Sequence, residues 1–367
     1  MHSLRRLTTV SLVPLTLALL TLAGCAGPGA LYRHDAANTG EFEGSGLDRM
    51  ERLAWKFRAG DKLYAAPVAA GDSVYLGASN GTLHAVDLKT GNQLWSVQTQ
   101  GSIESPVAVA GDVVYFGSWD GNVYAVDAKS HTMKWAFKSG GKIFGAPALV
   151  DGVLYVGSED RHLYAIDAAT GEAKWRYETP AGIYSSPAVR DGRVFVGCLD
   201  GSVYAVDAEN GREVWRFETG GPVYSSPAAG PEAVFIGSDD GYLYAINVMT
   251  GQKLWRFRTG GKVYASPAIT DDSVFVGSLS GFVYGVKRAT GELMWEFKTK
   301  SAVYSSPAVT WRAVYVGSTD GNLYAINRRT GEKLWNFDAN GRIFAAPLVV
   351  GERVIFTTLE GELFAID

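Results

Sequence analysis

The apolar positions of the chain form short runs that recur with a fixed period. Residues 194–197 and 203–206 are mostly β-branched or aromatic, a composition that favours β-strands. Turn-forming pairs at residues 200–201 and 210–211 separate the runs, and Asp, Asn and Gly tolerate the positive φ of tight turns. Copies of this unit recur every 40 residues, which is typical of a repeat architecture. The period is marked by Trp55, Trp95, Trp135, Trp175, Trp215, Trp255, Trp295 and Trp335.

Each unit predicts four strands and therefore one blade of a propeller. In one copy we expect strands over residues 194–197, 203–206, 214–217 and 223–228, joined by short turns. Four strands in about 40 residues match the size of a propeller blade. The eight copies predict an all-β fold, an eight-bladed β-propeller of four-stranded blades over residues 53–367.

The phase of the repeats predicts how the ring closes. Residues 360–367 match the strand that precedes the tryptophan strand in other units, and residues 53–57 match the tryptophan strand itself. We therefore expect the N-terminal strand with Trp55 to pair with the C-terminal strand that contains Leu363. This pairing removes the open sheet edge that a linear array would expose.

The tryptophans share a local motif of the form Ala-x-Asp-x-x-x-Gly-x-x-x-Trp. It is present, for example, at residues 85–95, 165–175 and 205–215. The motif resembles the tryptophan-docking motif of the pyrroloquinoline-quinone-like (PQQ-like) β-propeller repeat family, and the resemblance covers residues 53–367. In that family the indole packs between neighbouring blades, with the Gly and Ala making room for it. The resemblance thus implies a structural docking role for all eight tryptophans.

The first residues have the features of a targeting segment. Arg5 and Arg6 precede an apolar stretch over residues 7–22, and the segment ends in Leu22-Ala23-Gly24-Cys25. This ending resembles the lipobox of bacterial lipoproteins, which implies a lipoprotein signal peptide over residues 1–24 and a lipidated Cys25. Residues 25–52 then read as the lipidated cysteine and a flexible or surface-bound tether. The alternative is an uncleaved signal anchor with an incidental cysteine.

Charge and cysteine usage narrow the classes of partner and chemistry. The net charge is −4 without a block of like charge, which argues against nucleic acid as a partner. Cys198 occupies the position of Ser158 and Ser238 in sister units, so we expect a small packed residue and not a reactive thiol. Membrane contact is then expected only through the lipid anchor, on an otherwise monomeric propeller.

The repeat family includes quinoprotein dehydrogenases, in which the quinone sits on the axis with a calcium ion. Calcium prefers six to eight oxygen ligands, largely from carboxylates. Of the eight axial segments only one carries an acidic residue, Glu104, and Asp61 lies just before another. Serine pairs such as Ser185-Ser186 recur without a recurring base. We therefore predict no enzyme activity, no metal site and no cofactor, with a quinone-dependent oxidoreductase as a less favoured alternative.

Positions that differ from blade to blade are candidates for contact with a partner. The residue before each Asp-Gly turn varies, and we expect these turns on the same face as the start of the axial segments. Our hypothesis is a partner-binding face with apolar anchors around a basic mouth. The anchors are Trp119, Leu199, Leu279 and Leu359, and the basic residues are Lys62, Lys142, Lys262 and Arg342. The alternative is that these are scattered surface residues without a shared role.

The plan of a lipobox followed by eight repeats is similar to that of the propeller lipoproteins of the outer-membrane β-barrel assembly machinery. That resemblance implies a non-enzymatic scaffold for envelope proteins, anchored in the outer membrane and facing the periplasm. A second possibility is a small-molecule or glycan-binding propeller, which would have a pocket lined by Tyr and Ser at the axial mouth. The third possibility is a quinone-dependent oxidoreductase.

Overall fold

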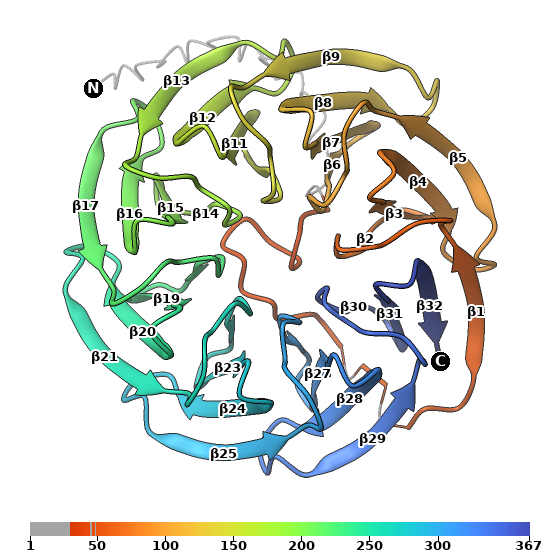
Figure 1. Ribbon diagram of the computed structural model, residues 1–367, viewed down its shortest axis with the longest axis vertical. Coiled ribbons are helices and arrows are strands. Elements are labelled where there is room, and N and C mark those ends of the chain that lie inside the picture. Colours follow the sequence, from red (N-terminus) through yellow and green to blue (C-terminus); the bar gives the residue numbers. More distant parts are fainter. Residues whose placement is uncertain (1–29, 45, 48) are drawn as a thin grey trace, which may run out of the picture.

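A computed structural model describes residues 30–44, 46–47 and 49–367, which form eight four-stranded antiparallel sheets around a central axis. The ring is evident in Figure 1 and confirms the predicted eight-bladed propeller. Along the described residues, no helix has the length and apolar character needed to cross a membrane. The proposed signal peptide over residues 1–24 and the proposed lipidation site Cys25 lie outside the described residues.

In seven blades the strands run from the axis outwards in chain order, and in the last blade β1 is the outer strand after β30, β31 and β32. The innermost strands are β2 (Val68–Ala70), β6 (Ala108–Ala110), β10 (Ala148–Val150), β14 (Ala188–Arg190), β18 (Ala228–Ala229), β22 (Ala268–Ile269), β26 (Ala308–Val309) and β30 (Leu348–Val350). The second strands are β3 (Ser73–Gly77), β7 (Val113–Gly117), β11 (Val153–Gly157), β15 (Arg193–Gly197), β19 (Ala233–Gly237), β23 (Ser273–Gly277), β27 (Ala313–Gly317) and β31 (Arg353–Thr357). The third strands are β4 (Thr82–Asp87), β8 (Asn122–Asp127), β12 (His162–Asp167), β16 (Ser202–Asp207), β20 (Tyr242–Asn247), β24 (Phe282–Lys287), β28 (Asn322–Asn327) and β32 (Glu362–Ile366). The outer strands are β5 (Gln93–Gln98), β9 (Met133–Lys138), β13 (Ala173–Glu178), β17 (Glu213–Glu218), β21 (Lys253–Arg258), β25 (Leu293–Lys298), β29 (Lys333–Asp338) and β1 (Leu53–Arg58).

The apolar core lies between the faces of neighbouring blades. The second and third strands are buried along almost their whole length, as β15 and β16 illustrate, because a blade covers each of their faces. The outer strand β17 instead alternates between exposed and more buried positions. One core cluster joins Phe195 and Val203 of one blade to Ile236 and Tyr244 of the next. Burial between blades explains the nearly continuous apolar runs of the sequence.

The innermost strand is shorter than the sequence predicts. We expected a strand over residues 223–228, but only Ala228–Ala229 pairs in the sheet as β18. Pro227 has no N–H to donate to a ladder. The Ser226 N–H donates instead to Ser266 Oγ in the next blade, at 2.9 Å. The axial segment therefore links neighbouring blades where a regular strand would extend its own sheet.

The ring closes where the sequence predicts. β1 pairs antiparallel with β32, with Trp55 opposite Ala365 and Phe57 opposite Leu363. The last blade in Figure 1 thus combines the N-terminal and C-terminal strands. The N–H groups of Glu51 and Arg52 also donate to the backbone oxygen of Asp367, at 2.7 and 3.0 Å. Pairing at this seam leaves β32 without an open edge, and β1 becomes the outer strand of the blade, as β5 and its counterparts are elsewhere.

The tryptophans dock on the following blade, as the repeat motif implies. Trp215 Nε1 donates to the Val248 carbonyl at 3.1 Å, and its indole lies against Gly251. A Cβ atom at Gly251 would come within 2.8 Å of the indole. Where the motif has its glycine, that residue makes room for the tryptophan of the preceding blade. Trp335 donates to the Leu47 carbonyl at 3.0 Å, which comes from the N-terminal segment.

The N-terminal segment is a plug that crosses the axis and binds to the ring, where the sequence predicted a flexible or surface-bound tether over residues 25–52. We use "the plug" for residues 30–44, 46 and 47. Its carbonyls at Ala30, Ala36, Thr39 and Gly40 accept hydrogen bonds from N–H groups of β6, β14, β22 and β26, at 2.6–2.9 Å. Inner strands have unpaired backbone groups on their axial side, and the plug satisfies several of them. Figure 1 shows this segment crossing the centre of the ring.

Candidate functional site

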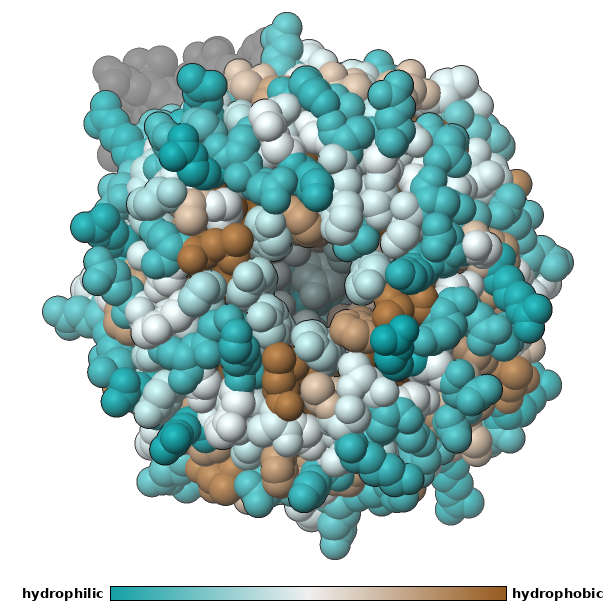
Figure 2. Space-filling view, viewed as in Figure 1, coloured by the Kyte–Doolittle hydropathy of each residue, from teal (hydrophilic) through white to brown (hydrophobic). Residues whose placement is uncertain are grey.

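One face of the ring brings together the two sets of residues that the sequence singled out. Each turn between a second and a third strand lies beside the start of an axial segment. The N–H groups of Leu279 and Leu359 donate to the carbonyls of Lys262 and Arg342, at 2.9 and 2.8 Å. We call this side the mouth face. Figure 2 shows a hollow at the ring axis, with apolar surface in separate patches among polar surface.

The apolar residues proposed as anchors differ in their exposure. Trp119, Leu199 and Leu279 are half-buried at their turns. Leu359 is only 4 % exposed, so the prediction of an accessible anchor is wrong there. Its burial leaves too little of the side chain in solvent for a partner to contact. Three of the four proposed anchors therefore remain accessible on the mouth face.

The mouth is not uniformly basic, because acidic turn residues pair with Lys262 and Arg342, two of the four cations that the sequence singled out. Lys262 Nζ lies 2.9 Å from Asp239 Oδ2, and Arg342 Nε lies 3.1 Å from Glu360 Oε1. Lys142 Nζ lies over the Trp119 indole, 4.5 Å from the ring centroid. Comparison of the eight repeats predicted where the cations lie. It overlooked the acidic residues that occupy the variable turn position, such as Asp239, or follow it, such as Glu360. A partner would therefore meet a mixed rim of charge and not a cationic ring.

An aromatic chamber lies on the axis below the mouth. The fourth residue before each inner strand is aromatic in seven blades and Glu104 in the eighth. The aromatic members are Tyr64, Phe144, Tyr184, Tyr224, Tyr264, Tyr304 and Phe344. Neighbouring rings contact one another, with centroid separations from 3.9 Å for Phe144–Tyr184 to 6.0 Å for Tyr64–Phe344. They line a cavity of about 190 Å³, and Tyr32 of the plug also lines it.

The serine pairs join the blades around this chamber. The N–H groups of Ser186, Ser226 and Ser266 each donate to the serine hydroxyl 40 residues further on, at 2.9 Å. Ser185 Oγ instead donates to the Gly197 carbonyl at 2.9 Å. These contacts give the serines a structural role and explain why the pairs recur without a base. They also fix the floor of the chamber.

Glu104 is the acidic member of the chamber wall. Its Oε1 accepts hydrogen bonds from Ser102 Oγ at 3.2 Å and from Ser79 Oγ at 3.5 Å. Burial raises the pKa of Glu104, and the serine bonds together with the charges of Lys142 and Lys62 oppose this rise. The carboxylate is thus held among hydroxyl donors and between two cations.

This arrangement does not fit a calcium ion with an axial quinone. Calcium takes six to eight oxygen ligands, largely carboxylate, whereas the chamber offers Glu104 with two lysines acting on it. The described residues contain no group of three or more His, Cys, Asp or Glu side chains arranged to hold a metal. The plug also crosses the axis on the other side of the chamber. The chain's residues therefore support no reaction step through that pair.

The remaining candidate groups have structural environments. Cys198 is buried, and burial raises the pKa of its thiol to about 11, so the thiolate is disfavoured at neutral pH. His84 is buried as expected, with Nδ1 at 2.9 Å from Gln93 Oε1. His131 stacks on Trp95 at 5.1 Å, in the place that glycine takes in sister blades. Each of these groups is explained by packing.

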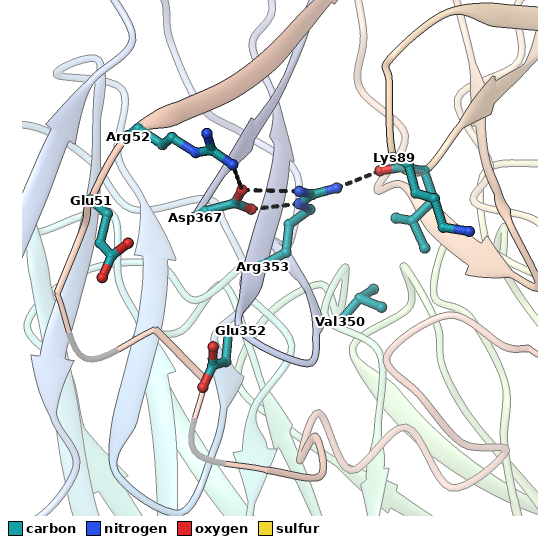
Figure 3. Close-up of a pocket in the computed structure, with 8 residues that line it drawn as sticks. Glu51, Arg52, Lys89, Val350, Glu352, Arg353 and Asp367 are labelled. Atoms are coloured by element: carbon teal, nitrogen blue, oxygen red, sulfur yellow. Dashed lines mark hydrogen bonds and ion pairs between the residues drawn. The ribbon is translucent and has the colours of Figure 1, made fainter.

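A larger cavity of about 550 Å³ lies at the ring seam. Arg353 forms two hydrogen bonds to the Asp367 carboxylate, at 2.6 and 3.0 Å, and donates to the Leu88 carbonyl at 2.6 Å. Figure 3 shows Arg353 between Asp367 and the chain next to Lys89, with Arg52 also facing the carboxylate. Hydrogen bonds from Arg353 lower the pKa of Asp367. We interpret this cluster as the clasp that closes the ring.

Comparison with known proteins identifies the architecture. The model of the beta-propeller of the beta-alanine-activating enzyme matches residues 47–272 and 155–367. Among the curated proteins, no sequence relative matches the chain.

Among solved structures, BamB from Moraxella catarrhalis has a TM-score of 0.75 and 19 % identity, covering 86 % of this chain and 99 % of that one. The computationally designed Ika8 protein has a TM-score of 0.78 and 19 % identity, with the same coverage. The quinohemoprotein alcohol dehydrogenase from Comamonas testosteroni has a TM-score of 0.78 and 16 % identity, covering 93 % and 81 %. Likeness at these identities concerns the fold alone, because one propeller fold carries many functions.

Proposed function

We propose that this chain, which belongs to the β-propeller family of the beta-alanine-activating enzyme, is a non-enzymatic lipoprotein scaffold of the cell envelope. Its most concrete form is a BamB-like role in the assembly of outer-membrane β-barrel proteins. The observation that carries the proposal is the combined plan of the chain. A leader that ends in Leu22-Ala23-Gly24-Cys25 precedes a single ring, and that ring corresponds to 99 % of the BamB chain from Moraxella catarrhalis.

The mouth face is the surface that we assign to the partner. Trp119, Leu199 and Leu279 replace one another at equivalent turns, where the scaffold itself does not require a particular side chain. Each is half-buried and therefore held in place, and Trp is enriched among the residues that contribute most to binding at protein interfaces. The charged pairs Lys262–Asp239 and Arg342–Glu360 lie on the same rim. Such rim charges favour orientation and specificity more than affinity.

In this proposal the lipid anchor and the propeller have separate roles. Acyl chains on Cys25 would hold the protein at the membrane, and the plug would connect that anchor to the ring. Because the plug bonds to several blades, the anchor would hold the whole ring and not one flexible arm. A scaffold benefits from such rigidity, since a preformed surface loses less conformational entropy on binding.

Affinity purification of the full-length protein from its own membranes tests the proposal. Crosslinked wild-type protein is compared with the double variant Trp119→Glu and Leu199→Glu. The matched control carries Trp311→Glu and Leu254→Glu, which place the same charges at positions that are 57 % and 51 % exposed away from the mouth. Thermal melts establish that all three proteins remain folded.

We expect envelope assembly proteins to be enriched with the wild type and the control, and to be lost with the mouth variant. If the assembly proteins are lost only with the control variant, the partner surface lies outside the mouth face. If no protein is enriched with any of the three, the scaffold function itself is refuted. Metabolic labelling with a radioactive fatty acid tests the anchor separately, and we expect Cys25→Ser to abolish the label.

A further inference from the structure

We propose that the aromatic chamber on the axis is a binding site for a small neutral polyhydroxylated ligand, such as a pyranose or the terminal sugar of a glycan. The proposal is independent of the scaffold function, because it concerns the inside of the ring and not the rim. It rests on the shape of the chamber, on unpaired hydroxyl groups in its wall and on the charges around Glu104.

The wall of the chamber is aromatic around most of its circumference. Seven of the eight equivalent axial positions are aromatic, and Tyr224 and Tyr264 contact each other with centroids 4.7 Å apart. The face of an aromatic ring carries negative charge density. It therefore attracts the weakly positive C–H groups on the flat sides of a pyranose. The cavity of about 190 Å³ is smaller than a drug-sized pocket, which suits one sugar ring.

The wall also offers hydroxyl groups that the protein leaves unused. Tyr184 donates its hydroxyl to Glu159 Oε1 at 2.9 Å. Within the described part of the chain, no partner is found for the hydroxyls of the four other tyrosines, Tyr64, Tyr224, Tyr264 and Tyr304. Each phenol can donate one hydrogen bond and accept others. A ligand with hydroxyls around its edge would satisfy several of these groups at once.

The charges around Glu104 decide between classes of ligand. Lys62 and Lys142 both act on this carboxylate, so an organic cation placed beside it would be repelled by two ammonium groups. An anion would be attracted by the two lysines but would have to lie against the Glu104 carboxylate, so neither sign of ion is favoured by the whole cluster. An apolar ligand would leave Glu104 and the free phenols without water or partners, which costs free energy for each group. A neutral polyol avoids all three penalties and can donate hydrogen bonds to the carboxylate.

The plug closes the chamber on one side. Tyr32 lines the same cavity as the tyrosines of the ring, and the plug is held to the inner strands by backbone hydrogen bonds. A ligand would therefore enter from the mouth and stop at the plug. This geometry favours the end of a glycan over the middle of a chain, because a polysaccharide could not thread through.

Saturation-transfer NMR on the purified protein tests the site. The probes are glucose, galactose, mannose, N-acetylglucosamine and their β-1,4-linked disaccharides, with tetramethylammonium as a cationic probe. The variants are Glu104→Gln and Tyr224→Phe, which remove one charge and one hydroxyl. The matched control is Tyr242→Phe, because Tyr242 lies on β20 outside the chamber. Melting temperatures show whether each variant remains folded.

We expect at least one sugar to bind, and each chamber variant to weaken it about tenfold, as the loss of one or two hydrogen bonds implies. Tyr242→Phe should bind like the wild type. If no sugar gives transfer at 50 mM, the proposal is overturned. Sugar binding that survives both chamber variants, or tetramethylammonium binding without sugar binding, overturns it as well. These results leave the partner assay on the mouth face unaffected, so the two proposals fail separately.

Discussion

Removal of a docking tryptophan tests the energetics of the ring most clearly. Trp215 is 8 % exposed, and its indole lies against Gly251 of the next blade and 5.7 Å from the Phe195 ring. Trp215→Ala removes this contact between two blades. The variant leaves a void that the glycine cannot fill, since Gly251 has no side chain to move into it.

The magnitude follows from packing more than from hydrogen bonding. Buried Trp→Ala substitutions lower the free energy of unfolding by about 3–5 kcal/mol. The Val248 carbonyl loses the indole N–H but still accepts a hydrogen bond from Arg193 Nη1 at 2.8 Å. It is therefore not left unpaired, and no further penalty for an orphaned acceptor is added. We expect a loss of about 4 kcal/mol.

Urea denaturation followed by near-ultraviolet circular dichroism measures this loss. The control is Trp311→Ala, because Trp311 is 57 % exposed at a turn, and surface substitutions usually change the free energy by less than about 0.5 kcal/mol. A loss below about 1.5 kcal/mol for Trp215→Ala, or an equal loss for both variants, would refute the inference that the indole binds the blades together.

Three further predictions concern the seam, the tyrosines and the plug. Arg353→Ala removes the clasp to Asp367 and should lower the free energy of unfolding by about 1.5–3 kcal/mol. Because the pKa of Asp367 is lowered in the folded protein, the difference in melting temperature between variant and wild type should shrink as the pH falls below about 4. Equal melting temperatures at pH 7 would contradict the clasp. Burial, together with the hydrogen bonds that their hydroxyls donate to Asp120 and Asp240, raises the pKa of Tyr124 and Tyr244 to about 12. Unfolded tyrosine ionises at about 10, so the free energy of unfolding should fall between about pH 10 and 12, and a melting temperature constant across that range would count against this linkage. Asn38 has a φ of 56° and donates to the Pro187 carbonyl at 3.1 Å, so Asn38→Ala should lower local stability by about 1–2 kcal/mol and speed proteolysis within the plug severalfold, whereas an unchanged cleavage rate would argue against the plug.

The repeat period made the fold predictable because each copy repeats the same local rules. Asp200-Gly201 specifies a turn, Val203 to Val206 a buried strand and Trp215 the contact to the next blade, and eight agreeing copies leave little ambiguity. The closure of the ring could be predicted from the phase of the repeats alone, since residues 53–57 supply the outer strand that the last repeat, ending at residues 360–367, lacks.

The plug could not be predicted because its hydrogen bonds to the inner strands use its backbone carbonyls. Residues 30–44 have no apolar period, and their bonds to β6, β14, β22 and β26 use carbonyls that every residue carries. The innermost strand was overestimated for a related reason. The N–H of Ser226 bonds to the next blade and not to its own sheet, which a strand propensity does not reveal.

The sequence predicted only part of the candidate site. The turns and cations of the mouth were placed together correctly, but their charges were counted without the neighbouring Asp239 and Glu360. An axial pocket lined by Tyr and Ser was predicted from the sequence only as an alternative, although Tyr64, Phe144 and their counterparts recur with the same period as the tryptophans. Glu104 stood out in the sequence as the acidic exception among the axial segments, but the aromatic residues that take its place in the other seven blades did not.

Site-specific photo-crosslinking in living cells of the source organism tests the central claim, a protein partner on the mouth face, most directly. A photoreactive amino acid replaces Leu199 in one protein and Leu254, on the outer strand β21, in another. The account predicts that the probe at position 199 captures a defined envelope protein and that the probe at position 254 does not. Capture of the same protein at both positions, or at position 254 alone, would contradict it, as would the absence of any adduct at position 199.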